Sequence, residues 1–264
     1  MHITGKWPSL NPNRLTMLFR DKAIIHLESV DSTNNYAASL IKLSRPPEGS
    51  VITAQEQTAG KGQRGALWTS DKGENLLFSI ILYPPFQQAE DLFALSQCIS
   101  LALADSLTEL TGIDAWVKWP NDIVMRDKKV AGILVEFAWT DSRVQSAICG
   151  MGVNLNQTSF EWPHAASLRM LTGKTFHRDT VLGEVIQRIE SGYLRLRSGQ
   201  LGPIRKEYTE RLYRLNTPTA FNHLGSRITA SISGVSPSGQ LQLRDDAGTL
   251  FSCDLREISL VYPP

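Results

Sequence analysis

A glycine-rich segment, residues 60–65, holds the first side chains whose types and spacing could support chemistry. It reads Gly-Lys-Gly-Gln-Arg-Gly. Glycines let backbone N–H groups approach an anion closely, and Lys61 and Arg64 could neutralise phosphate charge. The spacing also matches the G-x-G-x-x-G pattern of dinucleotide-binding folds, but that pattern requires a helix to begin on the glycines. Here the next predicted element is a strand, residues 76–82, so only a phosphate-binding loop and an ordinary surface turn remain open.

A glycine loop between two strands also covers ATP in protein kinases, and residues 177–179 read His-Arg-Asp, as in the kinase catalytic loop. The kinase interpretation nevertheless fails. No Asp-Phe-Gly sequence follows, Glu184 stands where the metal-binding asparagine is needed, and an apolar helix begins at once. We predict instead that Asp179 caps the N-terminus of that helix.

A second candidate is the segment Lys-Trp-Pro-Asn-Asp at residues 118–122, at the end of a predicted strand. Lys118 could contact a phosphate, and Asp122 could hold a metal ion or accept a proton from an amine. The alternative is a hairpin corner with a surface ion pair.

Two predicted strands carry glycines at which a ligand could approach the backbone closely. Lys129 begins one of them, and Gly132 in the same strand would let a ligand lie near the backbone. Gly150 and Gly152 lose packing in the next strand unless something approaches them, and Asn154 at its end could hydrogen-bond a sugar or phosphate. A solvated lysine and a β-bulge are the alternatives.

Hydrophobic periodicity predicts the elements that must position these residues. Strands are expected at residues 23–27, 51–57, 76–82, 115–119, 123–125, 129–138 and 144–154. Helices are expected at residues 36–43 (after a run of N-cap residues at 31–34), 89–110, 179–196 and 204–215. Short alternating runs follow at residues 227–235, 241–244, 249–255 and 257–261.

The order of these elements predicts the domain organisation and the fold class. Residues 1–22 form an irregular lead-in, residues 23–217 a catalytic body, and residues 218–264 a small all-β domain. Too few helices separate the strands for a doubly wound sheet, so the body is predicted to be α+β with mainly antiparallel strands.

Composition excludes several classes of protein. The chain of 264 residues is 42% hydrophobic with a net charge of +1, which argues against disorder and against general binding to nucleic acid or a membrane surface. Its three cysteines have no metal-ligand spacing, and their odd number argues against a secreted disulfide framework. The most apolar stretch, residues 75–83, is too short to span a bilayer. With no signal-peptide pattern at the N-terminus, we expect a cytoplasmic protein.

Taken together and in this order, the segments resemble those of biotin protein ligases. The matching residues are 31–34, 57–65, 68, 118–122, 129–136 and 150–154. The resemblance implies an α+β catalytic domain related to class II aminoacyl-tRNA synthetases and biotin synthetases, followed by an SH3-like all-β domain. It also implies a two-step reaction, in which ATP activates biotin as biotinyl-5′-AMP. A lysine of a biotin carboxyl carrier protein, from acetyl-CoA carboxylase or a related carboxylase, then receives the biotinyl group.

The resemblance also implies a role for each candidate residue. The expected catalytic residues are Lys129, Lys61, Arg64 and Asp122. The expected biotin-binding residues are Ser32, Thr33, Asn34, Gln57, Gly60, Lys61, Gly62, Gln63, Lys129 and Gly132. The expected ATP-binding residues are Lys61, Arg64, Trp68, Lys118, Asn121, Lys129 and Asn154. Mg²⁺ is expected to accompany ATP without a dedicated protein site.

Two departures from the family pattern stand out. Many members read Gly-Arg-Gly-Arg-Arg-Gly in the loop, so Gln63 replaces a cation associated with retention of the adenylate. Members that also repress transcription carry an N-terminal helix-turn-helix domain, and residues 1–22 have no paired helical pattern. We therefore expect a monofunctional ligase without a DNA partner; homodimerisation through an exposed strand is compatible with the sequence.

Three alternatives to a biotin ligase remain at the level of sequence. A lipoate protein ligase shares the fold and the adenylate chemistry but not this glycine loop and Lys-Trp-Pro-Asn-Asp segment. An octanoyltransferase would need a nucleophilic cysteine, for which Cys149 is the nearest candidate, although a packed cysteine is the simpler interpretation. A non-enzymatic biotinyl-AMP-binding protein would not need the cluster of Lys61, Lys129 and Asp122.

Overall fold

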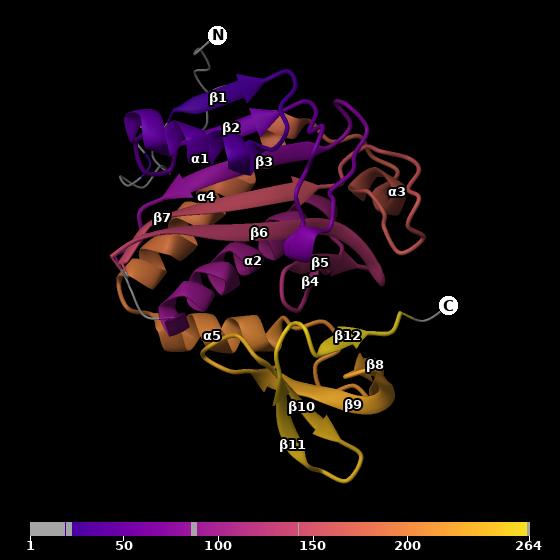
Figure 1. Ribbon diagram of the computed structural model, residues 1–264. Helices are drawn as coiled ribbons and strands as arrows, with labels where there is room; N and C mark the ends of the chain where they lie inside the picture. Colours follow the sequence, from indigo (N-terminus) through magenta and orange to yellow (C-terminus); the bar gives the residue numbers. More distant parts are fainter. Residues whose placement is uncertain (1–18, 20–22, 86–88, 142, 263–264) are drawn as a thin grey trace.

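The computed structural model describes residues 19, 23–85, 89–141 and 143–262, and its larger sheet forms the centre of the molecule (Figure 1). The strand order is β1-β2-β3-β7-β6-β5-β4. Only β1 and β2 pair in parallel; the other neighbours are antiparallel, as the sequence predicts. The strands are β1 (Ile24–Leu27), β2 (Val51–Ala54), β3 (Leu76–Leu82), β4 (Trp116–Lys118), β5 (Asp122–Met125), β6 (Lys128–Thr140) and β7 (Arg143–Val153).

Helices cover both faces of this sheet, which explains why β3 is buried along its whole length and apolar except for Ser79. Phe78 and Ile80 of β3 belong to the main core with α2 and α4, whereas Ile81 packs with α1 on the opposite face. Every residue of β3 is buried, so the strand has no polar-outward alternation. The α-helices are α1 (Thr33–Ser44), α2 (Ala89–Thr111), α3 (Leu168–Thr172), α4 (Arg178–Arg197) and α5 (Leu201–Glu210).

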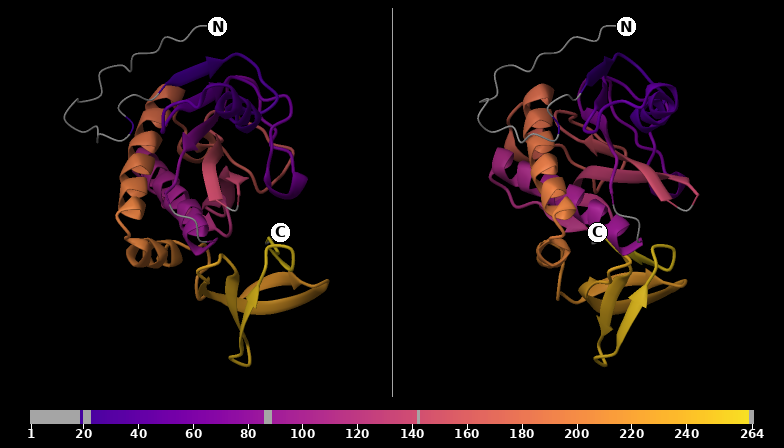
Figure 2. Two further views of the ribbon diagram at one scale, coloured as in Figure 1. Left: turned by 60° about the vertical axis from the view of Figure 1, so that its left-hand side comes forward. Right: turned by 90° about the vertical axis from the view of Figure 1, so that its left-hand side faces the viewer.

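A second sheet follows α5 and lies at one end of the body in both views of Figure 2. Its strand order is β11-β10-β9-β8-β12, and all of its pairings are antiparallel. The indole N–H of Trp119 donates to the Gly239 carbonyl (2.9 Å) and ties this sheet to the body. The strands are β8 (Thr219–His223), β9 (Ser226–Val235), β10 (Leu241–Asp245), β11 (Leu250–Cys253) and β12 (Ile258–Leu260).

Three local predictions were wrong, and a longer-range contact explains one of them, the end of α5. The residue at the N-cap of α4 is His177, and Asp179 lies inside the first turn. The predicted helix 204–215 ends at Glu210, since the backbone of Arg211 and Tyr213 bonds to Val117 of β4 instead. The predicted strand 51–57 ends at Ala54.

Some segments fall outside these predictions. The sequence patterns did not indicate α3 or β8. The predicted lead-in, residues 1–22, lies outside the described residues except for Phe19, which is buried and donates its backbone N–H to Glu190 Oε1 (2.9 Å). Within the described part of the chain, no helix has the length and apolar character that crossing a membrane requires.

The core between the sheet and the helices α2 and α4 should dominate stability. Phe78 is fully buried there, so Phe78→Ala should lower the free energy of unfolding by about 3–5 kcal/mol through lost burial and the cavity it leaves. Leu43→Ala, at a side chain that is 84% exposed, should stay within about 0.5 kcal/mol of the parent. Denaturant unfolding followed by circular dichroism measures both, and equal losses would contradict this assignment of the core.

Candidate active site

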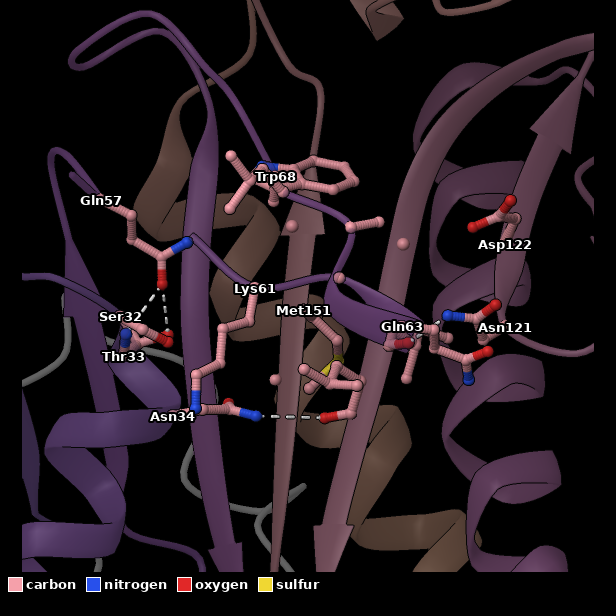
Figure 3. A pocket seen from close by; sticks show the side chains of 18 of the residues that line it. Ser32, Thr33, Asn34, Gln57, Lys61, Gln63, Trp68, Asn121, Asp122 and Met151 are labelled. Carbon is pink, nitrogen blue, oxygen red and sulfur yellow. Dashed lines mark hydrogen bonds between the residues drawn. The ribbon is translucent and has the colours of Figure 1, made fainter. Parts of the chain in front are cut away.

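A cavity of about 200 Å³ opens on the α1 face of the larger sheet. Its walls come from the start of α1, the glycine-rich loop, β5, β6 and β7. In Figure 3, Gln57 and Thr33 lie on one side of the cavity and Asn121 and Asp122 on the other. The lining includes most of the candidate residues, namely Ser32, Thr33, Asn34, Gln57, Lys61, Gly62, Gln63, Trp68, Asn121, Asp122, Lys129 and Gly132.

A polar network forms at the N-terminus of α1. Gln57 Oε1 accepts hydrogen bonds from the Thr33 backbone N–H (2.8 Å) and from Thr33 Oγ1 (3.0 Å). Ser32 occupies the N-cap position but makes no side-chain capping bond, so Gln57 satisfies this free helix donor in its place. The wall therefore presents hydroxyl and amide groups that are buried and held in position.

Two further side chains of this wall escaped the sequence analysis. Ser79 Oγ lies 2.7 Å from Thr33 Oγ1 and 2.6 Å from Asn34 Oδ1. Asn34 Nδ2 donates to Glu136 Oε2 (2.7 Å), and Lys61 Nζ lies 3.8 Å from Glu136 Oε1. Ser79 of β3 and Glu136 of β6 are polar residues inside otherwise apolar stretches of strand. Only the fold shows that both of them meet α1.

The opposite wall holds a cluster of three charges. Asp122 Oδ1 lies 2.7 Å from Lys129 Nζ, and Asp122 Oδ2 lies 3.4 Å from Lys118 Nζ. All three side chains are at least three-quarters buried, with exposures of 13% for Asp122, 24% for Lys129 and 19% for Lys118. Charges screened this little from one another interact more strongly than surface pairs. Asp122 therefore holds two cations that line different cavities, Lys129 the central cavity and Lys118 a neighbouring one.

Trp68 fills the space above the strand glycines. An added Cβ would come within 2.9 Å of the Trp68 ring at Gly132 and within 2.4 Å at Gly152, while at Gly150 it would meet Asn34 Oδ1 at 2.2 Å. Atoms do approach these glycines closely, as predicted, but they belong to side chains of the protein and not to a ligand. Lys129 Nζ also lies 5.5 Å from the centre of the Trp68 ring.

The glycine-rich loop folds back on itself as a short hairpin. The Trp68 backbone N–H donates to Gly60 O (2.9 Å), and residues 63–65 form a single 3₁₀ turn at the tip. Arg64 is exposed there with a left-handed φ of 57°. It lines a second cavity of about 290 Å³, together with Lys118, rather than the central one. Gly60 contacts Trp68 and does not line the central cavity.

A third and larger cavity, of about 600 Å³, lies on the far side of Trp68 and Lys129. Trp68 and Lys129 line both this cavity and the central one. Asn154 lines it as well, but its side-chain amide already donates to Ala166 O (3.2 Å). On the other side, Asn121 Nδ2 donates to Ile133 O (2.6 Å) and holds the corner after Pro120 against β6. The site thus has a small polar half and a wide half, with Lys129 between them.

The cysteine alternative fails on burial. Cys149 is fully buried in the main core, and this burial raises the pKa of its thiol well above the ordinary range. A nucleophilic cysteine needs the opposite environment. The chain therefore has no octanoyltransferase nucleophile at this position.

Comparison with known proteins bears directly on this arrangement. Residues 26–154 match the Biotin/lipoate A/B protein ligase family. A biotin--[acetyl-CoA-carboxylase] ligase of Paracoccus denitrificans is 33% identical over 233 residues, which cover 84% of this chain and 94% of that protein. The bifunctional ligase/repressor BirA of Bacillus subtilis is 29% identical over 241 residues, covering 88% of this chain and 73% of BirA.

The fold agrees with these sequence matches. A biotin protein ligase from Aquifex aeolicus, solved in complex with biotin and ATP, has a TM-score of 0.75 and 27% identity, covering 91% of this chain and 99% of that one. The α+β body and the small C-terminal β-sheet match the synthetase-like catalytic domain and SH3-like domain that the sequence predicts. On its sequence, its fold and the composition of its central cavity, the chain belongs to the biotin protein ligase family.

Proposed function

We propose that this protein uses ATP to activate biotin as biotinyl-5′-AMP and then transfers the biotinyl group to a lysine of a biotin carboxyl carrier domain. The observation that carries the proposal is the position of Lys129. Its ammonium group lines both the polar central cavity and the wide third cavity. A cation at that junction can meet a carboxylate from one side and a phosphate from the other.

The central cavity suits the ureido ring of biotin. A ureido group has two N–H donors and one carbonyl acceptor, and buried polar groups of this kind need partners. The wall formed by Ser32, Thr33, Asn34 and Gln57 offers hydroxyl and amide groups of both kinds. The dithiolane ring of lipoate has no N–H or carbonyl group that could pair with this wall, which favours biotin over lipoate.

The first step joins two anions, so charge neutralisation lowers its barrier. An oxygen of the biotin carboxylate attacks the α-phosphorus of ATP, the bond to the β-phosphate oxygen breaks, and pyrophosphate leaves. We propose that Lys129 contacts both reacting groups, because it lines both cavities. Lys118 and Arg64 line the neighbouring cavity, where they can contact the outer phosphates, and Lys61 flanks the biotin side.

The second step requires an amine beside the anhydride. The acceptor lysine nitrogen attacks the biotinyl carbonyl carbon, the bond to the AMP oxygen breaks, and the amine loses a proton. Asp122 lies on the cavity wall with two lysine ammonium groups already against its carboxylate. We propose that it orients the incoming amine and receives its proton.

The proposal also covers the metal ion that accompanies ATP. Among the described residues, no group of three or more His, Cys, Asp or Glu could hold a metal ion, so we propose that Mg²⁺ enters on the ATP phosphates and spreads their charge.

We assign Trp68, Asn121 and Asn154 to the nucleotide side and Gly60, Gly62, Gln63 and Gly132 to the biotin side. The division at residue 217, the absence of a DNA partner, a homodimer and a cytoplasmic location stay predictions.

The direct test is mass spectrometry of a purified biotin carboxyl carrier domain after incubation with this protein, ATP and biotin. We expect the mass to rise by one biotinyl group, and only when all components are present. Lipoate offered in place of biotin should leave the carrier unmodified. A carrier modified by lipoate, or unmodified by biotin, would contradict the proposal.

Lys129→Ala should reduce adenylate formation by about 10²-fold or more, because it removes the cation placed between carboxylate and phosphate. Release of pyrophosphate in the presence of biotin measures this step without any carrier. Lys72→Ala is the matched control, since Lys72 forms only a surface pair with Glu28 (2.8 Å). Normal turnover by Lys129→Ala would refute the assigned role.

Asp122→Asn should slow transfer from preformed biotinyl-AMP to the carrier by about 10²-fold or more, through lost orientation and proton acceptance. A single-turnover chase with added carrier isolates this step. Asp114→Asn, at an exposed carboxylate outside the cavities, should transfer at the parental rate. An unchanged rate for Asp122→Asn would remove Asp122 from the second step.

Gln63→Arg should slow the release of biotinyl-AMP, because it restores a cation at a position that lines both the central and the second cavity. The adenylate is an anion, so an added guanidinium strengthens its retention. Trapping of free adenylate after a single turnover gives the release rate. Equal rates for the parent and Gln63→Arg would show that position 63 does not control retention.

A further inference from the structure

The last described residues of the chain close on the catalytic body. The Val261 backbone N–H donates to Ala220 O (3.0 Å), which prolongs the pairing between β12 and β8. This bond fixes the backbone immediately before Tyr262. The Tyr262 side chain lines the second cavity beside Lys118 and Asn121, so a residue of the C-terminal sheet reaches the wall next to the active site.

Three contacts surround the Tyr262 ring. It stacks on His164, with ring centres 4.5 Å apart and planes 21° apart, and it meets Trp162 edge-on at 5.2 Å. Lys118 Nζ lies 5.5 Å from the centre of the same ring. Aromatic pairs and cation–π contacts of this geometry are attractive beyond the area that they bury. Tyr262 thus holds two aromatic residues and one cation of the catalytic body.

The hydroxyl group of Tyr262 adds no protein contact to these. Its Oη is buried and has no hydrogen-bond partner among the described residues. Burial, with a smaller contribution from the charge of Asp122, raises the pKa of Tyr262, so the hydroxyl stays neutral. The ring therefore makes the contacts with the catalytic body, and a phenylalanine could make them as well.

His164 links this ring to the reacting centre. The Lys129 backbone N–H donates to His164 O (2.7 Å), and the Ala166 N–H donates to Lys129 O (3.0 Å). The segment between β7 and α3, residues 154–167, thus pairs with the backbone of Lys129. Trp162, under the edge of Tyr262, lines the wide third cavity.

We propose that Tyr262 is a positioning residue for the nucleotide half of the site. Its ring holds Lys118, which lines the second cavity and not the central one. The inference rests on the proposed function, because it concerns a lysine that we assign to the ATP phosphates. ATP then binds to a cation that is already ordered, and the cost of ordering it does not reduce its affinity. Lys129 is held separately, by the pairing of β6 with β5 and by Asp122, and Tyr262 does not line the central cavity, so we expect biotin binding to be independent of Tyr262.

The test compares Tyr262→Ala with Tyr262→Phe in the whole protein. Calorimetric titration with α,β-methylene-ATP, which cannot be cleaved at the α-phosphorus, gives nucleotide affinity, and titration with biotin alone gives biotin affinity. Loss of the ring contacts in Tyr262→Ala should raise the nucleotide Kd by about tenfold or more. The same variant should keep the parental biotin Kd, and Tyr262→Phe should keep both affinities.

A matched control separates positioning from general stability. Phe251→Ala removes a ring of the same sheet that pairs with His223 (5.5 Å) and lines none of the three cavities. It should leave both Kd values unchanged. The inference is overturned if Tyr262→Ala binds the nucleotide normally, if both of its affinities fall together, or if Tyr262→Phe fails like Tyr262→Ala. A parent protein that forms no adenylate would instead contradict the proposed function.

Discussion

The contact between the Lys129 ammonium and the Asp122 carboxylate depends on the pairing of β5 with β6, and the rest of the site is arranged around it. A shift in register between Ile123 and Val124 places Gly132 opposite Asp122 and Lys129 opposite Val124. The lysine side chain then extends back along the sheet to the carboxylate (2.7 Å). A side chain at position 132 would come within 2.9 Å of the Trp68 ring, so the glycine opposite Asp122 leaves the space that Trp68 occupies beside the pair.

One face of the sheet carries the main apolar core, and the other face forms the central cavity. The face toward α2 and α4 carries the continuous apolar core, including Phe78 and Cys149. The other face carries α1 and the loop, and there the strands present glycines, Ser79 and Glu136 beside a smaller apolar cluster that includes Ile81. A rigid core on one face holds the polar groups of the other in fixed positions, which is the condition for preorganised charge stabilisation.

Much of this arrangement could be predicted because it is local. Strand β3 and helix α2 follow from hydrophobic periodicity alone, and the candidate residues came from the order of short segments. The contacts that were missed join residues far apart in the chain. Asn34 meets Glu136 through the strand order of the larger sheet, and Tyr262 meets His164 because the second sheet lies against the body. The same reason explains the end of α5, where pairing with Val117 overrides helical spacing.

We propose that two anions, the biotin carboxylate and the α-phosphate of ATP, react beside Lys129, between the central and the third cavity. Exchange of labelled pyrophosphate into ATP, measured without any carrier protein, tests it most directly because it reports only reversible adenylate formation. We expect exchange that depends on biotin and is absent with lipoate. Exchange without biotin, equal exchange with lipoate, or no exchange with biotin present would contradict it.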